Sequence, residues 1–374
     1  MSDIYLDEDA IIESGIEDNL EDSDELPFER YSITTYGIDF DISGLVNRIE
    51  KGIIKIPEFQ REFVWKDYQV SQFIETLLLG LPVPSIFLSK NSDGTFFVID
   101  GQQRLKSLYK FYKDGFQLTG VRTEFLGRTY DGNNPLDIDD RNILDGTFIR
   151  GTIMQQNSPD PKVNNSSVYF VFNRLNTNAS PLKPQEIRFA IFGGRFNDLL
   201  VELDNNSEWR KVIASKEALL RKRGQELILR FFALYFDSNH YASAKSMDDF
   251  LTQFMTKHQH DDEKSIDTMR QLFVNTFNCI TNTIPDDIKI FRIYDATKRR
   301  YSSGFNAAVF DSVMIGVAKR LHKGVIENID DLYENYQILM TNTDYVDAVR
   351  YATGNSKKVN RRIQLAVETF DGVK

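Results

Sequence analysis

Apolar residues recur along this chain with two different periods, and the change between them divides it. Between residues 36 and 115, stretches with the three- to four-residue period of a helix alternate with short β-rich runs. The helical stretches of this half lie at 42–49, 67–79 and 103–113. From about residue 196 onward, nearly every stretch has the helical period alone. The pattern therefore predicts an α+β protein, in which a mixed α/β domain is followed by a mostly α-helical domain.

The β-rich runs predict the strands of the first domain. Residues 84–100 form two such runs joined by Asn-Ser-Asp-Gly, which is typical of a hairpin. The run at 53–59 predicts a short strand that ends at Pro57, because proline cannot donate a hydrogen bond in a central strand. A further strand is predicted at 168–176, followed by a turn and a helix that begins near Pro184.

The hairpin ends in Asp100 and Gly101, and a helical pattern follows at once. Such a junction presents backbone N–H groups and the positive end of a helix dipole, which together bind anions, phosphate above all. Gly101 allows close approach, and Arg104 carries a planar charged fork suited to phosphate oxygens. Gln102 and Gln103 can donate to phosphate, sugar or base, and Asp100 can hold a ribose hydroxyl or hydrated Mg²⁺. The alternative is a tight turn whose polar side chains only cap the helix.

Polar residues also follow two other predicted strands. They are Gln60 and Arg61 after the first run, and Asn173, Arg174 and Asn176 at the end of the 168–176 run, with Glu186 and Arg188 on the next helix. Each has a simpler explanation, since an arginine can pair with a surface acid and an asparagine can cap a turn. Three such clusters nevertheless favour a ligand site, because α/β proteins bind ligands in crevices outside strand ends. The chain contains no G-x-x-x-x-G-K-[ST] phosphate loop.

The stretches "IPEFQREFVW", "VIDGQQRL" and "FNRLNTNASPLKPQEIR", in this order, resemble the N-terminal domain of GmrSD-type modification-dependent restriction enzymes. The resemblance is clear over residues 39–192 and looser beyond, where "TGNSKKVNRRI" is also similar to the family. That domain is distantly similar to the ParB and sulfiredoxin nucleotide-binding folds. The resemblance implies a ParB-like domain at 33–192 that binds and often hydrolyses nucleoside triphosphates, coupled to DNA recognition or cleavage in phage defence.

The resemblance also implies the residues of the site. Carried over by motif, the nucleotide pocket comprises Gln60, Arg61, Asp100, Gly101, Gln102, Gln103, Arg104, Arg174 and Asn176. Among these, Asp100, Gln103 and Arg104 are expected to act in hydrolysis, and Asp100 to hold Mg²⁺. The expected cofactors are therefore a nucleoside triphosphate and Mg²⁺.

In one respect the chain departs from the family. The full enzymes append an HNH-type nuclease domain with a catalytic histidine, and this sequence offers no plausible counterpart. His258 and His260 are two residues apart and would diverge on a helix, so they are expected at the surface. The cleaving subunit is then absent or a separate chain. Two alternatives stay open: a metal-dependent nuclease or nickase using Asp100 with Glu58 or Glu186, and a non-catalytic protein that senses nucleotide or DNA.

Charge is concentrated at the N-terminus. Residues 1–30 hold 12 acidic side chains and one arginine, a net charge of −11, whereas the whole chain carries −10, so the other residues sum to +1. Residues 1–32 are too polar to build a core and are expected to be a disordered tail. Its simplest role is to keep the protein soluble. The other is to mimic nucleic-acid charge over a basic groove, anchored by Ile11, Ile12 and Leu20.

Basic clusters in the helical domain, expected at 193–374, are candidates for contacts with DNA phosphates. The residues are Lys298, Arg299, Arg300, Lys357, Lys358, Arg361 and Arg362. A solvated helix end explains such clusters equally well. The single Cys279 excludes an internal disulfide framework, and no apolar run approaches the roughly 18 residues of a membrane span. A cytoplasmic protein without a membrane partner is expected, with homo-oligomers left open.

Overall fold

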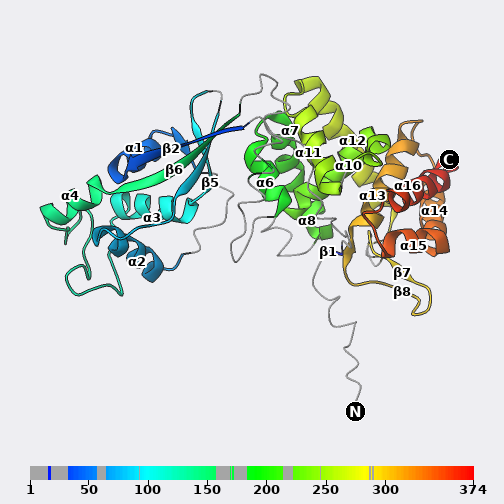
Figure 1. Cartoon of the computed structure of the whole chain (residues 1–374). Helices are drawn as coiled ribbons and strands as arrows, with labels where there is room; N and C mark the ends of the chain where they lie inside the picture. Colours follow the sequence, from blue (N-terminus) through cyan, green and yellow to red (C-terminus); the bar gives the residue numbers. More distant parts are fainter. Residues whose placement is uncertain are drawn as a thin grey trace, which may run out of the picture. The chain divides into compact units, whose positions relative to one another are not determined.

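The computed structural model divides the chain into two compact units, Glu29–Leu182 and Met1–Phe28 with Lys183–Lys374. Figure 1 shows their elements, and each unit is described by itself. The structure describes residues 16–17, 33–56, 65–91, 93–156, 169, 171, 183–213, 222–244, 246–285, 288 and 290–374. The predicted fold class is confirmed, since a mixed sheet with helices precedes an almost wholly helical region.

The first unit contains a five-stranded mixed sheet in the order β2-β6-β4-β5-β3. The strands are β2 (Ile33–Asp41), β3 (Ile54–Lys55), β4 (Ile86–Lys90), β5 (Phe96–Asp100) and β6 (Phe148–Gln156). β2 and β6 are antiparallel, as are β4 and β5, whereas β6 with β4 and β5 with β3 are parallel. The predicted hairpin at 84–100 is thus confirmed as β4 and β5.

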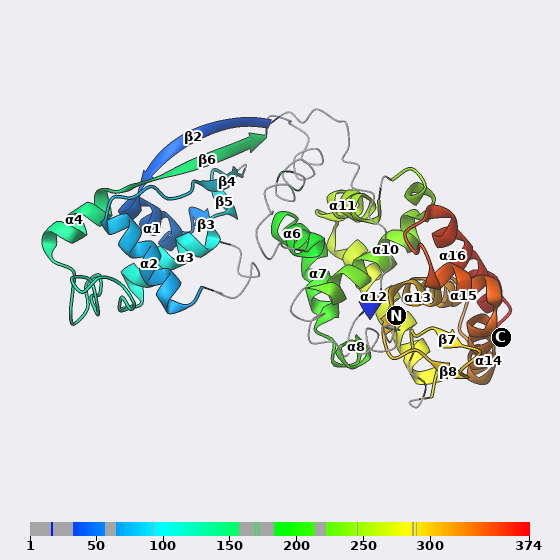
Figure 2. The same ribbon diagram turned by 60° about the horizontal axis from the view of Figure 1, so that its bottom comes forward.

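Among the described residues, the helices beside the sheet are α1 (Ile42–Glu50), α2 (Asp67–Leu78), α3 (Gln102–Lys113) and α4 (Ile138–Gly146). The first three correspond to the predicted helical stretches, and they lie on one face of the sheet (Figure 2). Leu45, Ile74 and Leu108 are buried in one core with Val98 and Ile153 of the sheet. The amphipathic spacing that predicted these helices therefore also indicates the face that each one buries.

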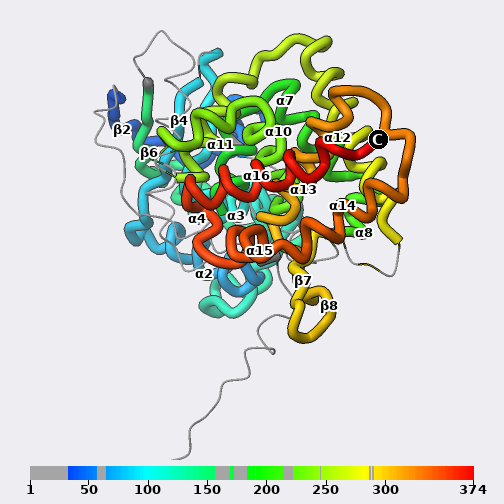
Figure 3. Tube along the Cα trace, turned by 90° about the vertical axis from the view of Figure 1, so that its right-hand side faces the viewer, coloured from blue at the N-terminus to red at the C-terminus, as the bar shows by residue number. Residues whose placement is uncertain are grey.

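The second unit is built from helices around a large apolar core. They are α6 (Pro184–Ile191), α7 (Arg195–Asp204), α8 (Ser207–Ile213), α10 (Arg223–Tyr241), α11 (Met247–His258), α12 (Glu263–Thr283), α13 (Ala307–Leu321), α14 (Ile329–Thr341), α15 (Thr343–Arg350) and α16 (Ser356–Asp371). α16 runs alongside α13 (Figure 3). A Cβ on Gly316 of α13 would lie 3.0 Å from the carbonyl oxygen of Ala366 in α16. Glycine at this position therefore lets the two helices approach closely.

Short strands complete the second unit. β7 (Tyr294–Asp295) and β8 (Arg300–Tyr301) form an antiparallel hairpin. β9 (Phe305–Asn306) pairs in parallel with β1 (Ile16–Glu17) near the N-terminus. Within the described residues, no helix has both the length and the apolarity needed to cross a membrane.

The two compact units divide at residue 182, so α6 packs within the helical unit, whereas the domain boundary predicted from the sequence lies at residue 192. The strand predicted at 168–176 lies mostly outside the described residues, and the two that are described, Tyr169 and Val171, are helical. An apolar run of this length does not by itself distinguish a strand from a buried helix, and Tyr169 is fully buried.

Candidate functional site

The junction between β5 and α3 has the geometry that its sequence predicts. β5 ends at Asp100, Gly101 adopts φ = 98°, and α3 begins at Gln102. A Cβ on Gly101 would lie 2.5 Å from Cγ2 of Ile86 in the neighbouring strand. Two separate constraints favour glycine at position 101: the left-handed backbone conformation and the close packing against Ile86. It also leaves the N-terminus of α3 without a side-chain cap.

Arg104 is held by protein groups on two sides. Its Nη2 donates to Oδ2 of Asp100 over 2.8 Å, and its Nη1 donates to the carbonyl oxygens of Pro84 and Ser85, the latter over 2.9 Å. The side chain is only 12% exposed. Burial lowers the pKa of Arg104, and the charge of Asp100 opposes that shift. The guanidinium thus ties the first turn of α3 to the end of β5 and to the segment before β4.

Gln103 joins two of the three motifs. The backbone N–H of Trp65 donates to Oε1 of Gln103 over 3.3 Å. Trp65 is the last residue of "IPEFQREFVW", and its ring packs edge-on against Phe73 of α2 at 5.6 Å between centroids. The first motif therefore ends beside the first turn of α3.

An open pocket of about 460 Å³ lies beside α3, a volume within the range of small-molecule sites. Its lining is Ile49, Glu50, Ile56, Lys106, Tyr109, Lys110 and Asp114. Ile56 is the first residue of "IPEFQREFVW", so both ends of that motif lie along α3. Burial lowers the pKa of Lys106. The ammonium of Lys110 lies 4.4 Å from the centroid of the Phe116 ring and 2.8 Å from Asp67.

Sequence reasoning missed the three polar α3 residues of this pocket. Lys106 and Lys110 follow Gln103 at intervals of three and four, which places them on one helix face with it. That spacing was the available signal. The other expected pocket residues, Gln60, Arg61, Arg174 and Asn176, lie outside the described residues, as do Asn173 and Glu58.

The part of the third motif that the structure describes, residues 183–188, forms hydrogen bonds and ion pairs within the helical unit. Oε2 of Glu186 accepts from the backbone N–H of Lys183 over 2.7 Å, which caps α6. Arg188 is 1% exposed and bonds Gln185, Glu226 and Asp248. Within the described residues, no group of three or more His, Cys, Asp or Glu side chains could hold a metal ion. The alternative metal role of Glu186 thus competes with its capping role.

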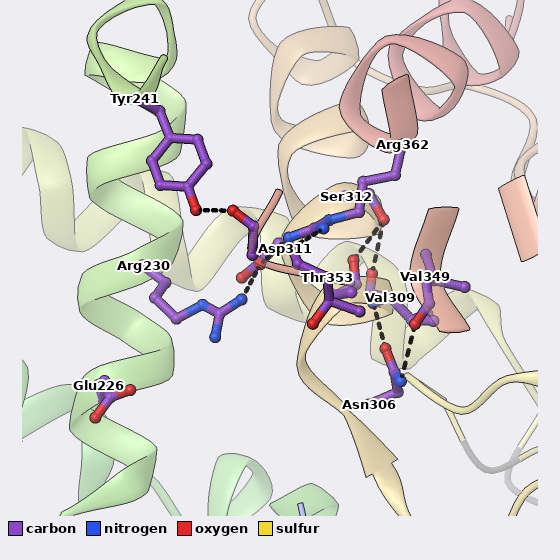
Figure 4. A network of polar contacts seen from close by, with 12 residues as sticks. Glu226, Arg230, Tyr241, Asn306, Val309, Asp311, Ser312, Val349, Thr353 and Arg362 are labelled. Carbon is purple, nitrogen blue, oxygen red and sulfur yellow. Dashed lines mark hydrogen bonds and ion pairs between the residues drawn. The ribbon is translucent and has the colours of Figure 1, made fainter. Parts of the chain in front are cut away.

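Arg362 is not a DNA contact. It is fully buried, and its Nη2 donates to Oδ2 of Asp311 over 3.1 Å, while Nη1 donates to the carbonyl oxygen of Thr353 over 2.6 Å. Oδ2 of Asp311 also accepts from Nη2 of Arg230 over 2.6 Å (Figure 4). The prediction for Arg362 is wrong because the charge that resembled a surface cluster serves this buried network.

The remaining basic candidates lie on the surface in two different settings. Lys358 pairs with Asp347, and Arg361 pairs with Asp344 over 2.9 Å, so acidic neighbours offset this cluster. Lys298 and Arg299 in the turn between β7 and β8, and Arg300 at the start of β8, are exposed. The turn is the better placed of the two to meet a polyanion.

One histidine also differs from its prediction. His258 is only 15% exposed, its Nδ1 lies 2.6 Å from Oδ2 of Asp261, and its ring lies 4.2 Å from that of Phe254. The surface assignment is therefore wrong for His258, because the last turn of α11 faces the aromatic core. His260 is exposed, as expected.

Comparison with known proteins agrees with the motifs. Residues 42–193 match the family model described as "GmrSD restriction endonuclease, N-terminal domain". No curated protein and no solved structure matched the chain. The matched residues run from α1 to the end of α6 and include all three motifs. Over residues 42–193, this chain therefore resembles the N-terminal domain of the GmrSD restriction endonucleases.

Proposed function

We propose that the chain is the nucleotide-binding, triphosphate-hydrolysing module of a restriction-type, DNA-targeting system. The observation that carries the proposal is the hydrogen bond between Trp65 and Gln103, which brings the first motif to the strand–glycine–helix junction. Ile56 and Trp65, which flank Gln60 and Arg61 in the sequence, both lie along α3. A helix N-terminus that begins at a glycine suits phosphate oxygens.

The residues of the junction divide into two roles. Gln102, Gln103 and the first turn of α3 would bind phosphate oxygens, with Gln60, Arg61, Arg174 and Asn176 completing the pocket as the family resemblance implies. Arg104 acts as a positioning residue, because it holds Asp100 at the end of β5. Lys106 and Tyr109 line the adjoining pocket and would take the rest of the nucleotide.

The residues present fit a Mg²⁺ ion that is coordinated mainly by the phosphates of the nucleotide and by water. The Asp100 side chain is 30% exposed, and its Oδ2 is bound to Arg104. Protein-bound Mg²⁺ usually keeps several waters and takes only one or two carboxylates besides substrate phosphates, and Asp100 can supply one. When bound, the ion would neutralise charge that develops on the phosphates.

A thermal-shift series tests the proposal. Nucleoside triphosphates with Mg²⁺ should raise the melting temperature, because a ligand that binds only the folded state stabilises it. Gln103→Ala should reduce that rise, because it removes the link between the two motifs. Arg122→Ala is the matched control, since Arg122 is 62% exposed in the same unit. The absence of a shift with every nucleotide would contradict the proposal.

Cleavage separates the proposal from its nuclease alternative. The DNA-targeting system would draw its nuclease from a separate subunit in the cytoplasm, so the purified chain alone should not cut duplex DNA efficiently, whether modified or not. Magnesium-dependent cutting that Asp100→Ala abolishes would favour the nuclease instead. Nucleotide binding without turnover would favour the regulatory alternative.

A further inference from the structure

The acidic N-terminal segment is attached to the helical unit at a defined place. β1 and β9 pair in parallel, with Ile16 opposite Phe305 and Glu17 opposite Asn306. β9 is fixed, because Phe305 is buried and the side chain of Asn306 caps α13 by accepting from the backbone N–H of Val309 over 2.9 Å. The segment therefore pairs with a strand whose side chains are buried in the core of the helical unit.

A basic turn, Lys298–Arg300, precedes β9 in the chain. Oδ1 of Asp295 accepts from the backbone N–H groups of Thr297 and Lys298 over 2.9 and 3.1 Å, which fixes the turn. The hydroxyl of Thr297 and these amides lower the pKa of Asp295, so it stays ionised. Three cations and one carboxylate then give the hairpin a net charge of +2. Neither Arg299 nor Arg300 has an ion pair with the described residues.

The parallel pairing also fixes the direction of β1 relative to β9. Both strands run the same way, so the N-terminal end of β1 lies beside the end of β9 that follows the basic turn in the chain. Asp7, Glu8, Asp9 and Glu13 precede β1 in the chain. Asp9 precedes Ile16 by seven residues, a reach of up to roughly 23 Å when extended. Arg300 precedes Phe305 by only five residues.

We propose that the basic turn is the docking surface for the acidic segment 7–13 of the same chain. The two-residue strand pair is too short to be stable alone, so the attraction between opposite charges would hold the segment there. Such a segment competes with any polyanion at a high effective concentration. If the proposed function holds and the polyanion is DNA, the segment limits DNA binding, and raised salt weakens both interactions.

Two full-length variants with equal charge changes test the docking. One neutralises the acids before β1, with Asp7→Asn, Glu8→Gln, Asp9→Asn and Glu13→Gln. The control neutralises four acids after β1, with Glu21→Gln, Asp22→Asn, Asp24→Asn and Glu25→Gln. Hydrogen exchange of residues 296–306 should accelerate on the order of tenfold in the first variant at low salt and little in the control. Equal exchange in both variants would overturn the docking.

A second measurement keeps the docking separate from the proposed function. Duplex DNA should bind the first variant on the order of tenfold more tightly than the unaltered chain, with a gain that shrinks as salt rises. The control variant should gain little. Faster exchange without any DNA binding would support the docking and overturn the DNA part of the proposed function. A gain in affinity that is equal in both variants would overturn a located docking surface.

Discussion

Oδ2 of Asp100 accepts a hydrogen bond from Nη2 of Arg104, one helical turn further along, over 2.8 Å. The same guanidinium bonds the carbonyl oxygen of Ser85. The side chain of "DGQQR" that most resembles a phosphate ligand is thus a brace between β5, α3 and the segment before β4. The glutamines between the two ends of the motif, Gln102 and Gln103, are the residues for which we propose contacts with phosphate.

Arg104→Ala should destabilise the protein even without nucleotide. It removes bonds to a carboxylate and to two carbonyl oxygens in a mostly buried setting, which costs about 1–3 kcal/mol. Urea unfolding measures this, with Arg122→Ala as the exposed control, expected within about 0.5 kcal/mol of the unaltered protein. Full stability of Arg104→Ala together with lost nucleotide binding would show that Arg104 binds phosphate directly.

Gly101→Ala should be more harmful than the same change at Gly115. Both glycines have positive φ, but a Cβ at Gly101 would lie 2.5 Å from Ile86, whereas nothing lies within 4 Å of one at Gly115. The control therefore carries backbone strain alone, about 1 kcal/mol, and Gly101→Ala adds a clash that costs about 1–3 kcal/mol more. Equal unfolding free energies for the two variants would contradict the close packing.

Much of the α/β unit is predictable because its signals are local. The alternation around Asn-Ser-Asp-Gly predicts the hairpin of β4 and β5, and the switch to helical spacing after Gly101 predicts α3. The order of the strands in the sheet is not predictable from such local signals, because the neighbouring strands β2 and β6 are more than a hundred residues apart in sequence. No pattern within either strand determines that pairing.

The buried arginines show why charge alone misleads. Arg362 follows Val359 by three residues and precedes Ala366 by four, so it occupies the apolar stripe of α16. That register was a readable sign of burial, but the neighbouring Lys357, Lys358 and Arg361 suggested a solvated cluster. Its partner Asp311 is 51 residues away in sequence, and only the packing of α13 against α16 brings the two together.

Asp41 should make the stability of the α/β unit depend on pH. It caps α1, and hydrogen bonds from the Ser43 hydroxyl and then the Gly44 N–H lower its pKa. A carboxyl whose folded-state pKa is lowered contributes stability above its unfolded pKa, near 3.9, and loses it as pH falls through the folded value. Asp41→Ala should cost about 1 kcal/mol at neutral pH and less in acid.

The matched control for this pH effect is Asp41→Asn, which retains a capping oxygen without a titrating group. The melting temperatures of this variant and of the unaltered protein are measured from pH 7 down to pH 3. They should converge as the carboxyl of Asp41 is protonated. A difference that stays constant over this range would show that the charge of Asp41 contributes nothing.

Asp311→Asn should be among the most destabilising single substitutions in the helical unit. Oδ2 of Asp311 accepts from both Arg230 and Arg362, and all three side chains are fully buried. Asparagine keeps the volume but leaves two guanidinium groups without the carboxylate charge that offsets them, which costs about 3–5 kcal/mol. Asp344→Asn is the control, because its exposed pair with Arg361 contributes about 0–1 kcal/mol.

Because two arginines share one carboxylate, the variants of this cluster should differ in how much stability they lose. Arg362→Met leaves Arg230 and Asp311 as a neutral buried pair, with the methionine filling part of the vacated space, so it should cost less than Asp311→Asn. Denaturant midpoints for both variants and for Asp344→Asn measure the order. If Asp311→Asn unfolds no earlier than the Asp344→Asn control, the buried charges are offset elsewhere and the carboxylate is not what holds α10, α13 and α16 together.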